Sequence, residues 1–345
     1  MAAARPAPQE DLFGVPAPQP VVAPVPPLPA HQALAAALPG DVRLGTMSWS
    51  YPGWAGIVYQ APVAAKALPR QGLAAYARHP LLRTVEIDRS YYQPLPATEL
   101  RAYADQVPAD FRFLVKAHED CTVVRFPPHA RYGRRRGEKN PLVFDPGYAT
   151  EQVVGPIVEG LGAKLGVILF QCPPQDVGEV GGAGGFADRL HRFLGALPKG
   201  PVYAVELRNT DLLTPAYGDA LAAAGAVHCH NRWTAMPPIT QQARALPPAT
   251  RRPLIVRWLL RPGDPYGEAG ARYEPFDRLR EEDPENRALV AGLVARAQAH
   301  GVPAIVTVDN KAEGCSPESI VRLAEAIVAL RAAAALTATP RKDGP

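Results

Sequence analysis

Short apolar runs alternate with amphipathic stretches along most of this chain, and each run leads into polar or charged residues. Runs of this length, bounded by polar residues, are typical of buried strands. The pattern predicts eight strands, over residues 42–47, 82–87, 111–115, 167–170, 202–207, 226–229, 254–256 and 304–308. Between them it predicts helices over residues 72–78, 98–106, 150–161, 186–197, 216–224, 284–300 and 317–333.

The regular alternation of strands and helices favours a parallel sheet. Eight such strands predict an α/β fold of the (β/α)8 TIM-barrel type. The alternative is a doubly wound open sheet, which usually carries a glycine-rich turn after its first strand. Here the first strand leads into SWSYPGWAG, which lacks that pattern. Between Asn231 and Leu254 no long helix is predicted, so the sixth unit is expected to be irregular.

Proline marks the expected limits of the folded domain. The first 40 residues contain ten prolines, and proline removes a backbone donor and fixes its own φ angle. Residues 1–40 are therefore expected to form a disordered Pro/Ala-rich leader, with a proline-rich docking segment as the alternative. The barrel domain is expected over residues 41–335, followed by a flexible tail over residues 336–345.

Composition and charge argue against several classes of protein, among them membrane-spanning, secreted and disulfide-rich proteins. The 345 residues are 47% hydrophobic with a net charge of +4, which allows an anionic partner without requiring one. No uncharged apolar stretch is long enough for a membrane span, and the amino terminus lacks the layout of a secretory signal. Four scattered cysteines suggest neither a zinc ribbon nor a disulfide framework. A cytoplasmic protein is expected.

Candidate catalytic residues follow from the strand ends. Active sites of TIM barrels lie at the carboxyl ends of the strands, and residues two apart in a strand share a face. Glu86 and Glu206 could serve as general acid and base if burial separates their pKa values. His230 completes the expected catalytic set. The alternative is a self-satisfied ion-pair network with no substrate.

A second group of residues at the strand ends suits an anion. Guanidinium groups bind carboxylates and phosphates through paired hydrogen bonds, and aromatic rings at a pocket mouth can stack on sugars or bases. A small anionic molecule is therefore the expected partner. The expected substrate-binding residues are Trp49, Tyr51, Lys116, Gln171, Arg208, Arg257, Asp309 and Asn310. No cofactor is expected, although a divalent metal on Glu86, Glu206, His230 and Asp309 is the alternative.

The long segment after the third strand carries a run of arginines, Arg131, Arg134, Arg135 and Arg136. On a loop above the site, these residues could hold a phosphate ester or a nucleic-acid backbone. A solvated charge run is the other interpretation.

Several motifs together resemble one family. Gly45-Thr46-Met47-Ser48-Trp49-Ser50-Tyr51-Pro52-Gly53-Trp54, Thr84-Val85-Glu86-Ile87-Asp88, Phe170-Gln171-Cys172-Pro173-Pro174, Ala204-Val205-Glu206-Leu207-Arg208 and Asp309-Asn310-Lys311-Ala312-Glu313-Gly314 stand in the order found in the YecE-like family, domain of unknown function 72. The resemblance implies a TIM-type barrel and does not imply a reaction. Asp88 and Asp309 stand where the family has asparagine.

The residues and the resemblance together favour an enzyme, a hydrolase or lyase that acts on an anionic substrate, whose anionic group could be a phosphate. Two alternatives stay open: a nucleic-acid-binding module without catalysis, and a metal-dependent phosphodiesterase.

Overall fold

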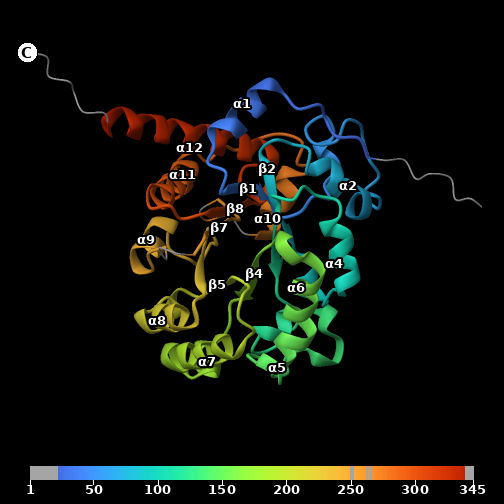
Figure 1. Cartoon of the computed structure of the whole chain (residues 1–345). Helices are drawn as coiled ribbons and strands as arrows, with labels where there is room; N and C mark the ends of the chain where they lie inside the picture. Colours follow the sequence, from blue (N-terminus) through green and yellow to red (C-terminus); the bar gives the residue numbers. More distant parts are fainter. Residues whose placement is uncertain (1–21, 249–251, 262, 264–265, 339–345) are drawn as a thin grey trace, which may run out of the picture.

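Eight parallel strands close into a barrel in sequential order within residues 22–248, 252–261, 263 and 266–338, which the computed structural model describes (Figure 1). The predicted fold class is confirmed. The strands are β1 (Val42–Thr46), β2 (Leu82–Ile87), β3 (Arg112–Lys116), β4 (Leu165–Cys172), β5 (Tyr203–Leu207), β6 (Val227–Asn231), β7 (Leu254–Trp258) and β8 (Ala304–Val308).

Helices surround this barrel (Figure 1). They are α1 (Pro29–Ala37), α2 (Leu68–Tyr76), α3 (Arg89–Tyr92), α4 (Ala97–Ala104), α5 (Pro146–Tyr148), α6 (Gly155–Leu161), α7 (Gly182–Ala196), α8 (Pro215–Ala224), α9 (Ile239–Ala245), α10 (Tyr266–Tyr273), α11 (Pro284–Ala299) and α12 (Ser316–Ala338). The sixth unit is irregular as expected, with only the short α9 between β6 and β7. None of the helices in the described residues has the length and apolar content needed to cross a membrane.

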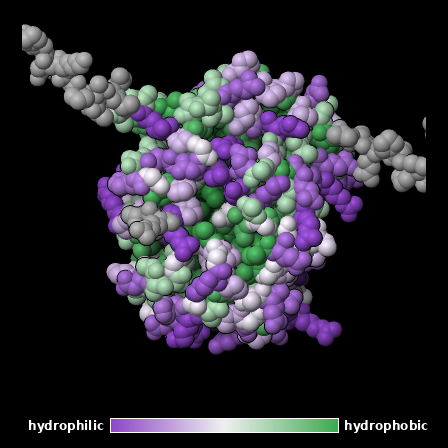
Figure 2. Space-filling model, viewed as in Figure 1, coloured by the Kyte–Doolittle hydropathy of each residue, from purple (hydrophilic) through white to green (hydrophobic). Residues whose placement is uncertain are grey.

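The alternation of residues along each strand divides the apolar side chains between two regions. Outward-facing residues such as Val85, Val205 and Val256 pack against the helices in one large cluster. Inward-facing residues such as Leu114 and Ile255 fill the barrel in a separate cluster. The space-filling view shows hydrophobic residues in the hollowed centre of the molecule and hydrophilic ones around them (Figure 2). Toward the carboxyl ends of the strands, the inward positions become charged.

The proline-rich segment was predicted to be disordered over residues 1–40, and the structure differs from this prediction for residues 22–40. Residues 22–40 are ordered against the barrel, and residues 1–21 lie outside the described part of the chain. Pro24 needs no donor, because the N–H of Val25 and the carbonyl of Ala23 make the hydrogen bonds to the segment around Tyr59. Pro29 begins α1, where a missing N–H costs nothing, and α1 then lies against α12. At the other end, α12 continues to Ala338, three residues into the expected tail.

The contact between β1 and β2 depends on a glycine. A Cβ atom on Gly45 would lie 1.8 Å from the backbone oxygen of Thr84. We expect Gly45→Ala to lower the free energy of unfolding by about 1–3 kcal/mol, because the strands must separate to relieve the clash. Gly40→Ala is the matched control, because no atom lies within 4 Å of its added Cβ. Urea unfolding of both variants tests this, and equal stabilities would contradict it.

Candidate functional site

A cavity of about 540 Å³ opens at the carboxyl ends of the barrel strands. Its wall combines charged and aromatic side chains, as expected for a site that orients a polar ligand. The lining residues are Met47, Ser48, Tyr51, Glu86, Asp88, Arg89, Tyr91, Tyr92, Lys116, Gln171, Arg208, Trp233, Arg257, Leu259, Asp309 and Lys311. The structure thus brings together residues from strands that are more than 200 positions apart in the chain.

Arg257, at the end of β7, is the centre of this site and is almost completely buried. Its Nε and Nη2 atoms donate to the two carboxylate oxygens of Glu86, at 3.0 and 2.8 Å. Its Nη1 atom donates to Glu206. One guanidinium group therefore bridges two carboxylates that come from opposite sides of the barrel, β2 and β5. Such a geometry offsets the cost of burying three charges.

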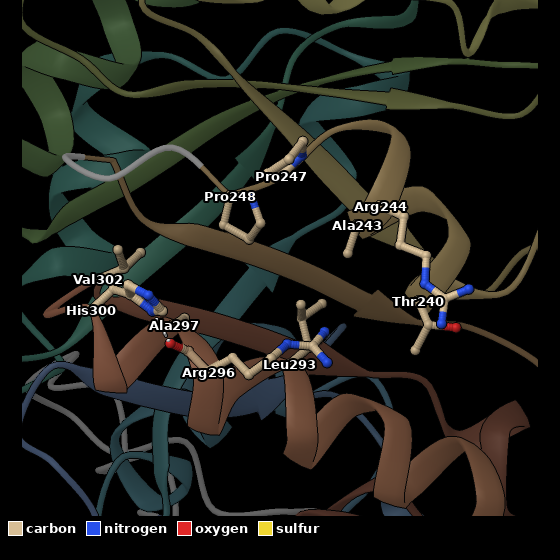
Figure 3. Close-up of a pocket in the computed structure, with 10 residues that line it drawn as sticks. All are labelled: Thr240, Ala243, Arg244, Pro247, Pro248, Leu293, Arg296, Ala297, His300 and Val302. Atoms are coloured by element: carbon tan, nitrogen blue, oxygen red, sulfur yellow. Dashed lines mark hydrogen bonds between the residues drawn. The ribbon is translucent and has the colours of Figure 1, made fainter.

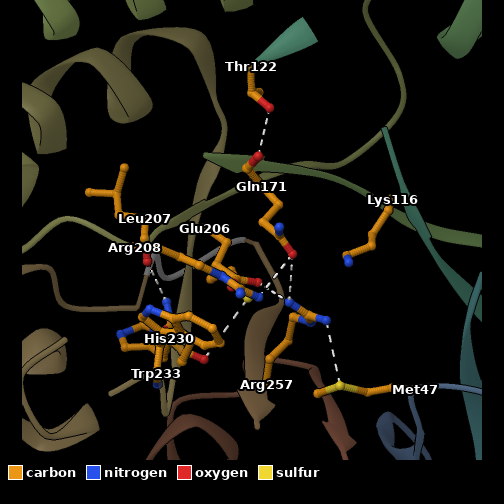
Figure 4. Close-up of polar contacts among 12 residues, drawn as sticks. Met47, Lys116, Thr122, Gln171, Glu206, Leu207, Arg208, His230, Trp233 and Arg257 are labelled. Atoms are coloured by element: carbon orange, nitrogen blue, oxygen red, sulfur yellow. Dashed lines mark hydrogen bonds and ion pairs between the residues drawn. The ribbon is translucent and has the colours of Figure 1, made fainter. Parts of the chain in front are cut away.

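Arg208 is the second guanidinium group of the site (Figure 4), and its side chain is more exposed than that of Arg257. Its Nε atom donates to Glu206 at 2.8 Å, and its Nη2 atom donates to the side-chain oxygen of Gln171 at 3.0 Å. The guanidinium carbon lies 3.9 Å from the ring centroid of Trp233. Within the described residues, Nη1 of Arg208 has no hydrogen-bond partner. A donor therefore remains for a ligand in the cavity.

Lys116, at the end of β3, is the third cation. Its ammonium group contacts the carboxylate of Asp88, lies 3.8 Å from Glu86 and lies 4.6 Å above the ring of Tyr91. The lysine side chain is buried, whereas 41% of the Asp88 side chain is exposed. Asp88 and Lys116 both line the cavity, so the charge of this ammonium group is balanced at the cavity wall.

Burial and charge separate the pKa values of the two glutamates. Burial raises the pKa of Glu86 and outweighs the opposing effect of Arg257 and Lys116. Burial also acts to raise the pKa of Glu206, but Arg257 and Arg208 outweigh it and lower that pKa to about 2. Glu86 lines the cavity and Glu206 lies beneath it. Of the two carboxyl groups, Glu86 is therefore the more readily protonated, while Glu206 holds the two arginines in position.

His230 does not join the two glutamates, contrary to the expected catalytic set. In β6, Cys229 faces the barrel interior, so His228 and His230 face the helices. His230 is buried with its ring against that of His228, and burial, followed by the effect of His228, lowers its pKa to about 3. A neutral imidazole outside the barrel cannot act on a substrate at the barrel mouth.

Two of the expected substrate-binding residues also lie outside the cavity. Trp49 is buried in the cluster between sheet and helices, and its indole nitrogen donates to the carbonyl of Leu68 at 3.2 Å. Asn310 accepts hydrogen bonds from the backbone and hydroxyl of Ser316, both at 2.8 Å. Both side chains support the architecture of the site. Tyr51, Gln171 and Asp309 line the cavity as expected.

The arginine loop is fastened to the protein by two of its four arginines. Arg131 pairs with Glu119 at 2.6 Å and Arg135 pairs with Asp120 at 2.5 Å. Arg131 also lies 4.8 Å above the ring of Tyr92, which lines the cavity. Arg134 and Arg136 are exposed. The loop therefore presents to solvent a smaller free positive charge than its sequence suggests.

The four residues considered for a metal do not form a ligand set. Within the described ranges, there is no group of three or more His, Cys, Asp or Glu side chains suited to hold a metal ion. His230 faces the helices, and both glutamates are bound by Arg257.

Asp88, Leu259 and Lys311 line the cavity but were not among the predicted site residues. Each follows a predicted site residue by two positions. Asp88 and Leu259 come directly after β2 and β7, so the alternation of the strand could have identified them, whereas Lys311 lies in a short 3-10 helix after β8. Met47 was also missed. Its sulfur lies 3.5 Å from Nη2 of Arg257.

Another cavity, of about 430 Å³, lies outside the barrel between α9 and α11 (Figure 3). Arg244, Arg296 and His300 surround an apolar floor that includes Leu293 and Val302. None of the predicted site residues lines it. Catalytic groups do not converge there, so the barrel mouth is the candidate functional site.

A family model described as "Protein of unknown function DUF72" matches residues 43–343. The chain belongs to the DUF72 family, the family that its motifs resemble. Its fold is similar to a DUF72 protein from Thermotoga maritima MSB8, with 19% identity, a TM-score of 0.54 and coverage of 82% of this chain and 98% of that one. It is also similar to a DUF72 protein from Enterococcus faecalis V583, with 16% identity, a TM-score of 0.53 and coverage of 83% and 95%.

At these identities the similarity supports the fold and gives no information about the reaction. No curated protein matches the chain. Any statement about function therefore depends on the chemistry of the cavity.

Proposed function

We propose that this protein is an enzyme, a hydrolase or lyase, that binds a small anionic, phosphate-bearing substrate in the cavity at the barrel mouth. The observation that carries the proposal is the convergence of Lys116, Arg208 and Arg257 on a cavity that is also lined by a buried carboxyl group. Arg208, which keeps a donor for a ligand, binds the substrate anion, and a carboxyl group with a raised pKa supplies a proton.

Each of the proposed roles has its own structural support. Arg208 is held by Glu206 and Gln171 and keeps Nη1 for the ligand. Tyr51 and Tyr92 offer aromatic surface beside the charged groups. Glu86 donates a proton to the leaving group, and burial keeps its pKa above the ordinary value. Arg257 fixes the position of Glu86 from below.

Nucleic-acid binding without catalysis is the weaker alternative. Its support is the exposure of Arg134 and Arg136, while Arg131 and Arg135 are engaged with carboxylates of the same loop. A nucleic-acid backbone bound there would give an affinity that falls steeply with salt and that depends on Arg134 and Arg136.

Binding of dimethyl phosphate, a phosphate with a single negative charge, tests the proposal. We expect Arg208→Gln to weaken this binding about 10-fold or more, because the variant loses a charge-assisted donor at the cavity. Arg136→Gln, which removes an exposed arginine from the loop, is the matched control and should change the affinity less than about twofold. Isothermal titration calorimetry measures both. Weakened binding in the control alone would move the anion site to the loop, and no binding to any form would end the proposal.

A further inference from the structure

The charges that line the cavity are nearly balanced, and Asp88 is one of the carboxylates that balance them. The three cations of the site are already matched by carboxylates: Arg257 by Glu86 and Glu206, Arg208 by Glu206, and Lys116 by Asp88. Elsewhere on the wall, Asp309 and Lys311 add one charge of each sign, and Arg89 is paired with Glu99 at 2.5 Å. The cavity therefore holds no large excess of positive charge.

Among these carboxylates, Asp88 differs in its access to the cavity. Glu86 and Glu206 have no exposed side-chain surface, whereas 41% of the Asp88 side chain is exposed. Lys116 also contacts Tyr91 and lies near Glu86. An anion in the cavity that approaches this ammonium group also comes close to the carboxylate of Asp88, its ion-pair partner.

The carboxylate of Asp88 is ionised in this position. Burial acts to raise its pKa, but Lys116 outweighs that effect, with further help from Arg257 and Arg208, and the pKa lies below the ordinary value. A fixed negative charge repels a dianion about twice as strongly as a monoanion at the same place, because the Coulomb energy is proportional to the charge of the ligand.

On the basis of the proposed function, we propose that Asp88 is a specificity-determining residue that selects ligands with a single negative charge, such as phosphodiesters, over dianionic phosphomonoesters. Arg208 binds the one charge of the phosphodiester. Asp88 keeps Lys116 neutralised, so that the second charge of a monoester finds no partner.

Two small probes separate these ligand classes, dimethyl phosphate as the monoanion and methyl phosphate above its second pKa of about 6 as the dianion. Isothermal titration calorimetry at constant ionic strength gives the affinity for each. We expect Asp88→Asn to strengthen methyl phosphate binding about 10-fold and dimethyl phosphate binding about 3-fold, since the effect on the free energy is twice as large for the dianion. The selectivity of the protein then shifts toward the monoester by about 3-fold.

Asp110→Asn is the matched control. It removes the same charge from a surface pair with Arg83 at the opposite end of the barrel, and it should leave both affinities within about twofold. The double variant Asp88→Asn/Lys116→Met removes one charge of each sign and should return the selectivity to that of the natural chain. Circular dichroism confirms that each variant is folded.

Two negative results would have different meanings for Asp88 and for the proposed function. If Asp88→Asn leaves the ratio of the two affinities unchanged while Arg208→Gln still weakens both, the inference about Asp88 is wrong and the proposed anion site stands. If neither probe binds to the natural chain or to Asp88→Asn, the proposed function itself fails.

Discussion

Arg257→Met is expected to destabilise the protein by about 3–5 kcal/mol, because it leaves Glu86 and Glu206 buried without their shared partner. Methionine keeps much of the volume of arginine, so the loss reports on charge more than on packing. Arg257→Lys should recover only a part of the stability, since an ammonium group cannot make the paired hydrogen bonds to Glu86 and reach Glu206 at the same time. Urea unfolding at neutral pH measures the effect.

The matched control for this prediction is Arg83→Met. Arg83 pairs with Asp110 at 2.6 Å on the surface, where the carboxylate side chain is 60% exposed, and its loss should cost less than about 1 kcal/mol. Equal stabilities of the two variants would mean that the barrel tolerates two unbridged carboxylates. Arg257 would then not stabilise the barrel by bridging Glu86 and Glu206.

The pH dependence of the free energy of unfolding tests the interaction of Arg257 with Glu206 independently. Glu206 has a folded-state pKa of about 2, below the ordinary value of 4.5, so its contribution to stability is present above pH 4.5 and is lost as the pH falls toward 2. In Arg257→Met, protonation of the buried carboxylates relieves the unfavourable charge. The difference in stability between the two proteins should therefore shrink as the pH falls, and a constant difference would indicate a packing effect.

Glu86→Gln is expected to lower the turnover number of the enzyme strongly. With a phosphate-bearing substrate in hand, Glu86→Gln is expected to lower kcat by about 10²–10⁴-fold, the usual contribution of a general acid or base. Glutamine retains the shape of the side chain and an oxygen that can accept from Arg257. It cannot supply the proton.

The dependence of kcat on pH distinguishes proton donation by Glu86 from a purely structural role of this side chain. If Glu86 donates a proton, kcat of the natural chain should fall as the pH rises through the raised pKa of Glu86, and this limb should disappear in Glu86→Gln. Glu159→Gln, which removes an exposed carboxylate paired with Arg101, should leave the profile unchanged. A Glu86→Gln variant with kcat within about threefold of the natural value would exclude Glu86 from proton transfer.

Much of the architecture could be predicted from the sequence because the barrel depends on local patterns. Apolar runs mark the strands, and their polar ends mark the face where the site lies. The same alternation correctly places Glu86, Glu206 and Arg257 at the inside of the barrel. The prediction of disorder was wrong for the part of the N-terminal segment that the structure describes. The reason is local, because Ala23 and Val25 make the hydrogen bonds that Pro24 cannot make.

The details of the site could not be predicted because they depend on pairings across the whole chain. Glu86 and Arg257 are 171 positions apart, and no local pattern identifies them as partners. The orientation of His230 was also ambiguous. The sequence His228-Cys229-His230 offers a thiol to one face and imidazoles to the other, and only the register of β6 decides which of them enters the barrel.

The most direct test of an anion site at the barrel mouth is a crystal structure of the protein with perrhenate, a tetrahedral anion with a single negative charge that anomalous scattering locates without ambiguity. We expect one ordered perrhenate in the cavity within hydrogen-bond distance of Nη1 of Arg208. Perrhenate bound only at Arg134 and Arg136, or in the groove beside Arg244 and Arg296, with an empty cavity at the barrel mouth, would contradict the proposed site.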